Sequence, residues 1–117
     1  METRKVPKPW GHELIFAVTK SYVGKVIFIK KGEALSLQYH NIKDETIHVQ
    51  SGRIQFLTAS KPQEQLQETI LEPGQSFHIP PKLVHRMVAL EDTTLLEVST
   101  PELDDVVRLE DRYGRKS

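Results

Sequence analysis

The sequence predicts a single all-β domain, built as a small antiparallel sandwich or barrel. Apolar residues recur mostly with period two, in short runs, which is the pattern of strands with one buried face. The runs begin roughly every ten residues and are separated by turn residues, as in sandwiches and barrels. No long 3.6-residue apolar period appears, so we expect little helix. A length of 117 residues fits one domain.

Nine segments are expected to be strands, because each alternates apolar and polar residues between turn signals. They are Leu14–Thr19, Tyr22–Lys30, Leu35–Tyr39, Glu45–Gln50, Arg53–Ala59, Gln67–Leu71, Ser76–Pro80, His85–Leu90 and Thr94–Thr100. A short helix is expected around Leu103–Leu109. The charged segment Arg108–Ser117 is expected to be a solvated tail. We therefore expect one domain over residues 1–117, with an N-terminal strand extension and a charged C-terminal tail.

Composition excludes several classes of function. The chain has no cysteine, so a disulfide framework, a zinc finger and a cysteine nucleophile are excluded, and a metal would need nitrogen and oxygen ligands. Sixteen basic residues balance sixteen acidic ones, so no global charge attracts nucleic acid or an anionic membrane. No segment reads as a signal peptide or a membrane span. We expect a cytoplasmic protein that binds neither nucleic acid nor membranes.

Four residues form a candidate metal-binding set. Gln38 and His40 are two apart, so in a strand both side chains leave the same face. Glu45 begins the next strand after a short loop, and a hairpin would return its carboxylate toward His40. His85 follows a second turn-rich stretch. The set suits zinc, manganese, iron, cobalt or nickel. On spacing alone, partly buried structural histidines remain an alternative.

These positions match two sequence motifs of a known superfamily. The first motif has glycine, five residues, His-x-His, three or four residues, glutamate, six residues and glycine. Here it reads Gly32, Gln38-Tyr39-His40, Glu45 and Gly52. The second motif is matched by Gly74, Pro80, Lys82 and His85, with Ala89 in its last position. The chain thus resembles the cupin superfamily, which implies a double-stranded β-helix, or jelly-roll barrel. Gln38, Lys82 and Ala89 depart from the commonest motif residues.

Four further matches are more specific. They are Lys8-Pro9-Trp10-Gly11, the stretch Gly32–His40, Ile79-Pro80 with His85-Arg86, and Arg108-Leu109-Glu110-Asp111-Arg112-Tyr113-Gly114-Arg115. Together they resemble the C-terminal cupin domain of type II phosphomannose isomerases, over nearly the whole chain. Glutamine in the position of Gln38 is typical of that branch. No guanylyltransferase segment accompanies these motifs, so we expect no nucleotide-sugar synthesis.

The resemblance implies a metal-dependent isomerase that interconverts mannose 6-phosphate and fructose 6-phosphate through an enediol. One divalent ion, zinc first among the candidates, would be held by Gln38, His40, Glu45 and His85 and act as a Lewis acid. Candidates for the proton-transferring base are His78 and Glu97. Strand alternation places His78 away from Phe77 and Ile79. The candidates for phosphate binding are Lys8, Arg86 and Arg112, since phosphate needs cationic donors.

Alternatives remain at this point, because cupins host many functions. The chain could be a metal cupin of other activity, such as a dioxygenase or an epimerase-like enzyme, or a non-catalytic sugar-binding module. Ile42 and Thr46 stand where type II isomerases often carry further histidines, which leaves the substrate open. The run Val26-Ile27-Phe28-Ile29 is apolar at both parities, so it is either covered on both faces or part of an interface. We expect a homodimer.

Overall fold

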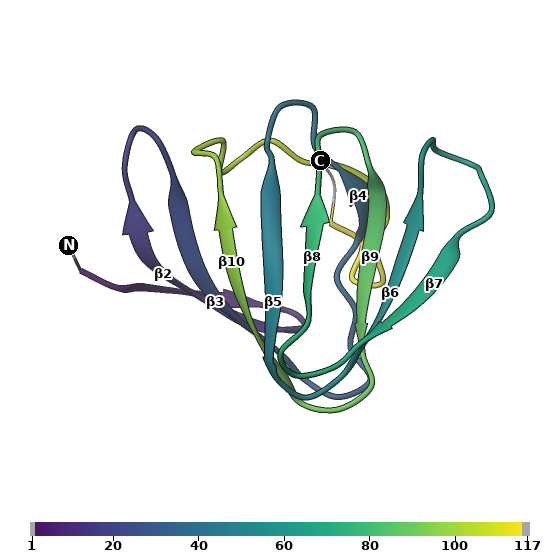
Figure 1. Ribbon diagram of the computed structural model, residues 1–117, viewed down its shortest axis with the longest axis horizontal. Helices are drawn as coiled ribbons and strands as arrows, with labels where there is room; N and C mark the ends of the chain where they lie inside the picture. Colours follow the sequence, from purple (N-terminus) through teal and green to yellow (C-terminus); the bar gives the residue numbers. More distant parts are fainter. Residues whose placement is uncertain (1, 116–117) are drawn as a thin grey trace.

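The computed structural model describes residues 2–115, which form eleven strands and no helix. The strands make two antiparallel sheets, ordered β1-β2-β3-β10-β5-β8 and β11-β4-β9-β6-β7 (Figure 1). The bounds are β1 Arg4–Lys8, β2 Gly11–Val18, β3 Val23–Ile29, β4 Leu37–Tyr39, β5 Glu45–Ser51, β6 Ile54–Ala59, β7 Gln67–Leu71, β8 Ser76–Ile79, β9 Val84–Ala89, β10 Thr93–Ser99 and β11 Val107–Glu110. The prediction of a single all-β domain with antiparallel sheets is confirmed.

All nine expected strands are present, with bounds that differ from the prediction by a few residues at most. The short helix expected around Leu103–Leu109 is wrong. Those residues form a turn at 103–104 and then enter β11, which pairs with β4. The acidic pair that suggested a helix start has another use, because the Asp105 carboxylate accepts hydrogen bonds from a different loop. No helix that could cross a membrane occurs among residues 2–115.

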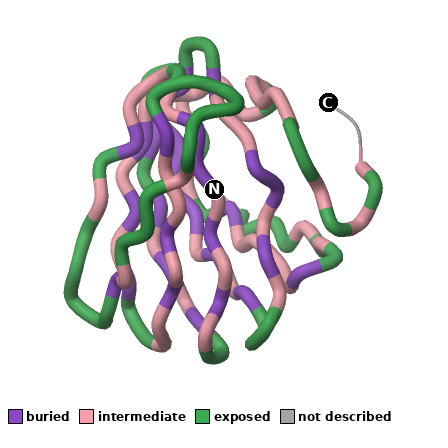
Figure 2. Tube along the Cα trace, turned by 90° about the vertical axis from the view of Figure 1, so that its right-hand side faces the viewer, coloured by how far each residue is buried: buried purple, intermediate pink, exposed green. Residues whose placement is uncertain are grey.

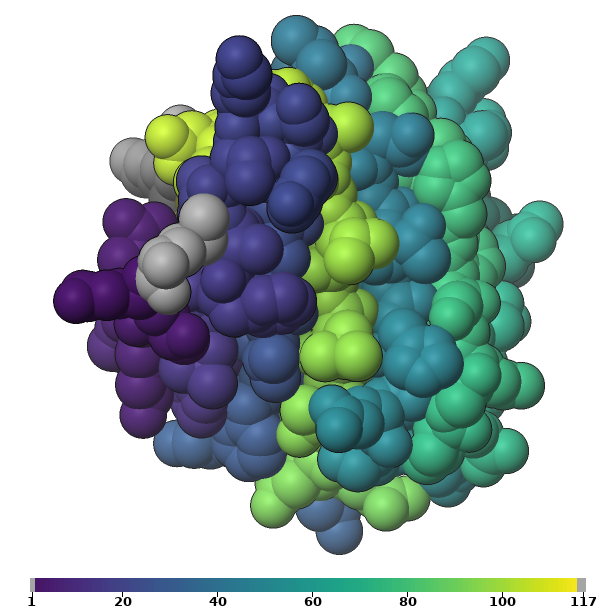
Figure 3. Space-filling model, turned by 60° about the vertical axis from the view of Figure 1, so that its left-hand side comes forward, coloured from purple at the N-terminus to yellow at the C-terminus, as the bar shows by residue number. Residues whose placement is uncertain are grey.

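Crossovers between the sheets place segments distant in sequence side by side. β10 lies between β3 and β5, pairing Glu97 with Lys25 on one side and with Ile47 on the other. Figure 3 shows this order on the outer face, where a yellow-green band from β10 separates the dark blue β3 from the teal β5. Residues 50 and 72 positions apart in the sequence therefore share one inward-facing surface.

Inward positions alternate with outward ones most regularly along β5 and β10, and Figure 2 shows the alternation of buried and less buried stretches across the barrel. On β5 the buried residues are Glu45, Ile47 and Val49, and on β10 they include Leu95 and Glu97. The interior therefore has an apolar region and a charged region. The apolar core cluster comprises Trp10, Ile27, Ile29, Ile47, Val49, Ile54, Phe56, Leu71, Ile79, Met87, Ala89 and Leu95.

Two glycines with the same backbone conformation differ in their surroundings. Gly52 and Gly74 both have φ of 90°, a left-handed value that side chains rarely adopt. A Cβ on Gly52 would lie 2.4 Å from the carbonyl oxygen of Asp92, whereas a Cβ on Gly74 would meet nothing within 4 Å. The turn at Gly52 is therefore constrained by conformation and by packing against the start of β10.

We predict that Gly74→Ala lowers the free energy of unfolding by about 1 kcal/mol, which is the cost of the left-handed conformation alone. Gly52→Ala should lower it by about 3 kcal/mol or more, because the methyl group also displaces backbone. Urea unfolding of both variants measures the difference. Equal losses would contradict the packing constraint at Gly52.

Candidate metal centre

Three buried side chains from both sheets converge inside the barrel. His40 follows β4, His85 lies on β9, and Glu45 begins β5 in the opposite sheet. The Nε2 atoms of His40 and His85 lie 3.7 and 3.8 Å from the same carboxylate oxygen, Oε1 of Glu45. One ligand atom from each residue falls within 4.8 Å of the others. This spacing allows one ion to contact all three.

Both imidazoles are oriented by main-chain carbonyls. Nδ1 of His40 lies 2.5 Å from the carbonyl oxygen of Asp105, and Nδ1 of His85 lies 2.9 Å from that of Leu83. A carbonyl oxygen only accepts, so each Nδ1 must carry the hydrogen. In the neutral rings Nε2 then presents its lone pair toward Glu45. This is the arrangement that orients metal-binding histidines in proteins.

Gln38, the fourth candidate ligand, lies at the neighbouring strand position. It pairs with His85 in the β4–β9 ladder and lines the same pocket. Its amide nitrogen donates to Oγ of Ser36 at 3.0 Å. The amide oxygen is then the atom that Gln38 can offer to an ion. Two imidazoles, one carboxylate and one amide oxygen, without a thiolate, fit a divalent ion that accepts nitrogen and oxygen ligands.

The electrostatics keep the site in its metal-binding protonation state. Burial opposes ionisation of Glu45, but its interactions with His40 and the charge of Lys43 outweigh burial and lower the pKa of Glu45 to about 2. Burial lowers the pKa of His85 to about 4, against the attraction of Glu45. Glu45 is therefore anionic and His85 neutral near pH 7, as cation binding requires.

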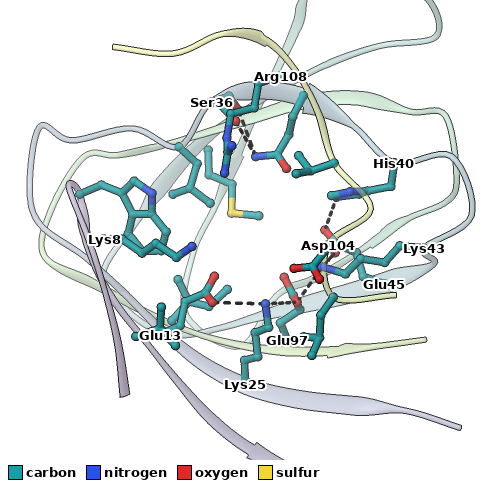
Figure 4. A pocket seen from close by; sticks show the side chains of 18 of the residues that line it. Lys8, Glu13, Lys25, Ser36, His40, Lys43, Glu45, Glu97, Asp104 and Arg108 are labelled. Atoms are coloured by element: carbon teal, nitrogen blue, oxygen red, sulfur yellow. Dashed lines mark hydrogen bonds and ion pairs between the residues drawn. The ribbon is translucent and has the colours of Figure 1, made fainter. Parts of the chain in front are cut away.

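These residues line a cavity of about 490 Å³, a volume typical of small-molecule sites. Figure 4 shows His40 and Glu45 on one side of the pocket and Lys8 on the opposite side. Arg4, Arg108 and Arg115 also line the pocket. Cationic side chains therefore surround a pocket that has several carboxylates along one wall. The cavity suits a polar, anionic small molecule.

A row of alternating charges runs along one wall of the pocket. Lys43 Nζ lies 2.8 Å from Oε2 of Glu45 and 3.3 Å from Oε2 of Glu97. Lys25 Nζ follows, 3.9 Å from the same oxygen of Glu97 and 3.3 Å from Oε1 of Glu13. Sequence reasoning found Glu97 but missed Glu13, Lys25 and Lys43. Lys25 carried a usable signal, because it shares the strand parity of the inward residues Val23 and Ile27.

The pKa values of the row follow from its burial. Burial and the nearby Glu45 raise the pKa of Glu97, although Lys43 and Lys25 pull it down. Burial lowers the pKa of Lys43, but the two carboxylates Glu97 and Glu45 outweigh burial and the net change is upward. Lys43 is thus a fixed positive charge, and Glu97 is the carboxylate whose affinity for a proton is increased.

Asp105 organises the metal side of the pocket and was also missed. Its carboxylate accepts hydrogen bonds from the amides of Asn41, Ile42 and Lys43 at 2.7 to 3.0 Å, while its carbonyl holds His40. The pKa of this carboxyl is lowered to about 2, because the three amide hydrogen bonds outweigh burial. Since the folded-state pKa is depressed, the contribution to stability is complete above the ordinary value of 3.8 and is lost as pH falls toward 2.

The remaining candidates divide between the pocket and the surface. Glu97 and Lys8 line the pocket. His78 is exposed and its Nε2 lies 2.6 Å from Asp44, outside the pocket lining, because its side chain points to the outer face of β8. Arg86 and Arg112 are also absent from the lining. Arg86 donates to the carbonyls of Leu35 and Glu110, and Arg112 donates to that of Gly32, so both fasten the C-terminal segment to the barrel.

Lys82 is a departure from the cupin motif, and its backbone conformation shows how the turn accommodates it. It occupies the glycine position of the second motif and adopts φ of 75°. Glycine takes this left-handed conformation freely, whereas a lysine there costs about 1–2 kcal/mol. Its amide donates to the carbonyl of His40 at 2.7 Å and its Nζ lies 2.6 Å from Oδ1 of Asn41. The turn is thus retained with local compensation.

The two antiparallel sheets, with two histidines and a glutamate converging inside the barrel, have the architecture of a cupin. A cupin described as RmlC-like, from Shewanella frigidimarina, superposes with a TM-score of 0.73 at 16% identity, over 88% of this chain and 87% of that one. Residues 1–111 match the family model described as "Mannose-6-phosphate isomerase C-terminal". The chain therefore belongs to the mannose-6-phosphate isomerase C-terminal family, as its motifs indicated.

Two relatives of this chain are longer proteins. The xanthan biosynthesis protein XanB of Xanthomonas campestris is 35% identical over 96% of this chain and 24% of its own length. The mannose-1-phosphate guanylyltransferase ManC of Salmonella typhimurium is 32% identical over 96% of this chain and 23% of its own length. The chain spans about a quarter of the length of these relatives.

We predict that Asp105→Asn weakens zinc binding by about tenfold or more, because the neutral amide holds the loop 41–43 and the segment carrying the His40 partner less firmly. Titration of metal-free protein with zinc in a calorimeter measures the effect. Asp92→Asn is the matched control, since Asp92 accepts one amide hydrogen bond from Lys31 in a different turn. Zinc affinities that are equal in the two variants would contradict the role assigned to Asp105.

Proposed function

We propose that the protein is a metal-dependent aldose–ketose isomerase that interconverts mannose 6-phosphate and fructose 6-phosphate. The observation that carries the proposal is one pocket that contains both a candidate nitrogen–oxygen metal-binding set and Glu97, a buried carboxylate with a raised pKa. Membership of the mannose-6-phosphate isomerase C-terminal family supports this choice among cupin activities. The names of the longer relatives, a xanthan biosynthesis protein and a guanylyltransferase, are consistent with sugar-phosphate metabolism.

The metal-binding residues would be Gln38, His40, Glu45 and His85. Zinc is the first candidate, with manganese, cobalt, nickel and iron as alternatives. A divalent ion held there would act as a Lewis acid that stabilises negative charge on the sugar oxygens. Lys43 supports Glu45 in this task, because its ammonium holds Oε2 of the carboxylate and leaves Oε1 facing the two imidazoles.

Glu97 is the residue that we propose for proton transfer. The reaction removes a proton from C2 of the aldose and returns one to C1, while a hydroxyl proton moves from the oxygen on C2 to that on C1. Both lysine contacts of Glu97 use Oε2, which leaves Oε1 as the atom that exchanges the proton. Its raised pKa favours proton uptake. The alternative base, His78, is not retained, because it lies outside the pocket.

Lys8 is the residue that we propose for phosphate binding. It lines the pocket across from His40 and Glu45 (Figure 4). Arg4 lies two positions from the inward-facing Val6 on β1 and lines the same pocket, so it is a second cation for this role. Arg86 and Arg112 are not retained for phosphate, since their guanidinium groups hold main-chain carbonyls elsewhere.

We also propose that the protein forms a homodimer in the cytoplasm. Phe16, Val18 and Val98 are exposed apolar residues on the outer face of the β2–β3–β10 region. Burial of such a face against a second copy would remove it from water. Sedimentation equilibrium measures the state directly.

The proposal predicts that metal-free protein refilled with zinc, manganese, cobalt or nickel converts mannose 6-phosphate to fructose 6-phosphate. His40→Ala should abolish turnover by removing a ligand. Glu97→Gln should lower kcat by about 100-fold or more while zinc affinity changes little, because the amide cannot take up a proton. A coupled assay for fructose 6-phosphate measures the rates.

The control is His78→Gln, which changes an exposed histidine of the same barrel and should leave kcat unaltered. No turnover with any of the metals, in protein shown to hold one ion per chain, would overturn the isomerase. Such a chain would then be a metal cupin of another activity or a sugar-binding module.

A further inference from the structure

The buried Lys25 and the partly buried Glu13 form an ion pair that the proposed isomerisation does not use. Lys25 is 6% exposed, and its Nζ lies between Oε1 of Glu13 and Oε2 of Glu97. The three residues come from β2, β3 and β10, which are adjacent strands of one sheet. Their inward direction follows from the pairing of Lys25 with both Ile15 and Glu97 in the ladder.

The placement of these charges inside the barrel is energetically unfavourable for a purely structural role. Removal of two charges from water costs several kcal/mol per ion before their attraction is counted, and well-packed apolar residues are often as stable or more so. Apolar side chains fill the inward positions next to them on the same strands, such as Ile27 and Leu95. All three charged residues also line the pocket. A polar ligand is therefore the expected neighbour of these groups.

The pair occupies the middle of the pocket. Figure 4 shows Glu97, Lys25 and Glu13 along one wall, between Glu45 on one side and Lys8 on the other. The ammonium of Lys25 has three N–H donors; one is donated to Oε1 of Glu13 at 3.3 Å, whereas Oε2 of Glu97, at 3.9 Å, is beyond hydrogen-bond distance. At least one donor, together with the carboxylate oxygens, can serve a ligand that lies along this wall.

Sugar hydroxyls match such a row because each hydroxyl both donates and accepts one or more hydrogen bonds. Successive hydroxyls of an extended chain would meet carboxylates as acceptors and an ammonium as donor. A cyclic sugar presents its hydroxyls around a ring, whereas an open chain presents them along a line. The linear order of charged groups therefore favours the open-chain form.

We propose that Lys25 and Glu13 bind the middle hydroxyls of an open-chain sugar phosphate, which extends from the metal-binding residues to Lys8. The proposal deepens the proposed function and rests on it for the identity of the substrate. It makes Lys25 and Glu13 substrate-binding residues that select the extended form of the sugar, and it assigns them no part in proton transfer.

The test is calorimetric binding of mannitol 6-phosphate to zinc-loaded protein. This open-chain alditol phosphate has no carbonyl, so its binding is independent of isomerisation. Lys25→Met should weaken its binding about tenfold or more, because a charged hydrogen-bond donor to a hydroxyl is lost. Binding of zinc and of inorganic phosphate should stay within about twofold, since neither reaches the middle of the wall. Lys20→Met, an exposed lysine of the β2–β3 turn, is the matched control.

Lys25→Met leaves Glu13 and Glu97 without their shared partner, so the double variant Lys25→Met/Glu13→Gln, with one negative charge fewer, is measured beside it. Unchanged binding of mannitol 6-phosphate in a folded variant would overturn the proposal, as would parallel losses of zinc and phosphate binding. No binding to the unmodified protein would also overturn it. Binding without turnover of mannose 6-phosphate would instead refute the isomerase and leave the open-chain site standing.

Discussion

Two main-chain carbonyls, those of Asp105 and Leu83, orient the two imidazoles inside this barrel, and the candidate metal site depends on that orientation. Each accepts the Nδ1 hydrogen of one imidazole, and each thereby directs Nε2 at the same oxygen of Glu45. The two carbonyls belong to segments far apart in the chain. The C-terminal segment that contributes Asp105 thus lies against the candidate metal-binding residues, and its three amide contacts with the loop 41–43 fix the path from His40 to Glu45.

The interior of the barrel has a charged region and an apolar region. Strand alternation sends Lys25, Glu45 and Glu97 inward, at positions where apolar residues would be more stable. The energetic penalty is limited because each charge has an opposite neighbour, and the row as a whole alternates in sign. The rest of the interior is apolar and supports the fold, which leaves the charged wall free to serve a ligand.

The fold and the convergence of His40, Glu45 and His85 could be predicted from the sequence because both follow short-range patterns. Period-two alternation gave the nine strands, and the spacing of Gln38, His40, Glu45 and His85 matched a known motif. Asp105 could not be found this way, since its partners lie more than 60 residues earlier and no local pattern marks them. The residues of the expected helix instead form a turn and β11, which pairs with the distant β4. Arg86 and Arg112 match motif positions in the sequence. Only the three-dimensional structure shows that their guanidinium groups donate to main-chain carbonyls.

The central claim is that His40, Glu45, His85 and Gln38 bind one ion through Nε2 and oxygen atoms. Zinc-loaded crystals measured at the zinc absorption edge test it most directly. The account predicts one anomalous peak per chain inside the barrel, about 2.0–2.2 Å from Nε2 of His40, Nε2 of His85 and a Glu45 oxygen, with the Gln38 oxygen also in contact. A barrel without the peak, or zinc bound only at the exposed pair of His78 and Asp44, would contradict it.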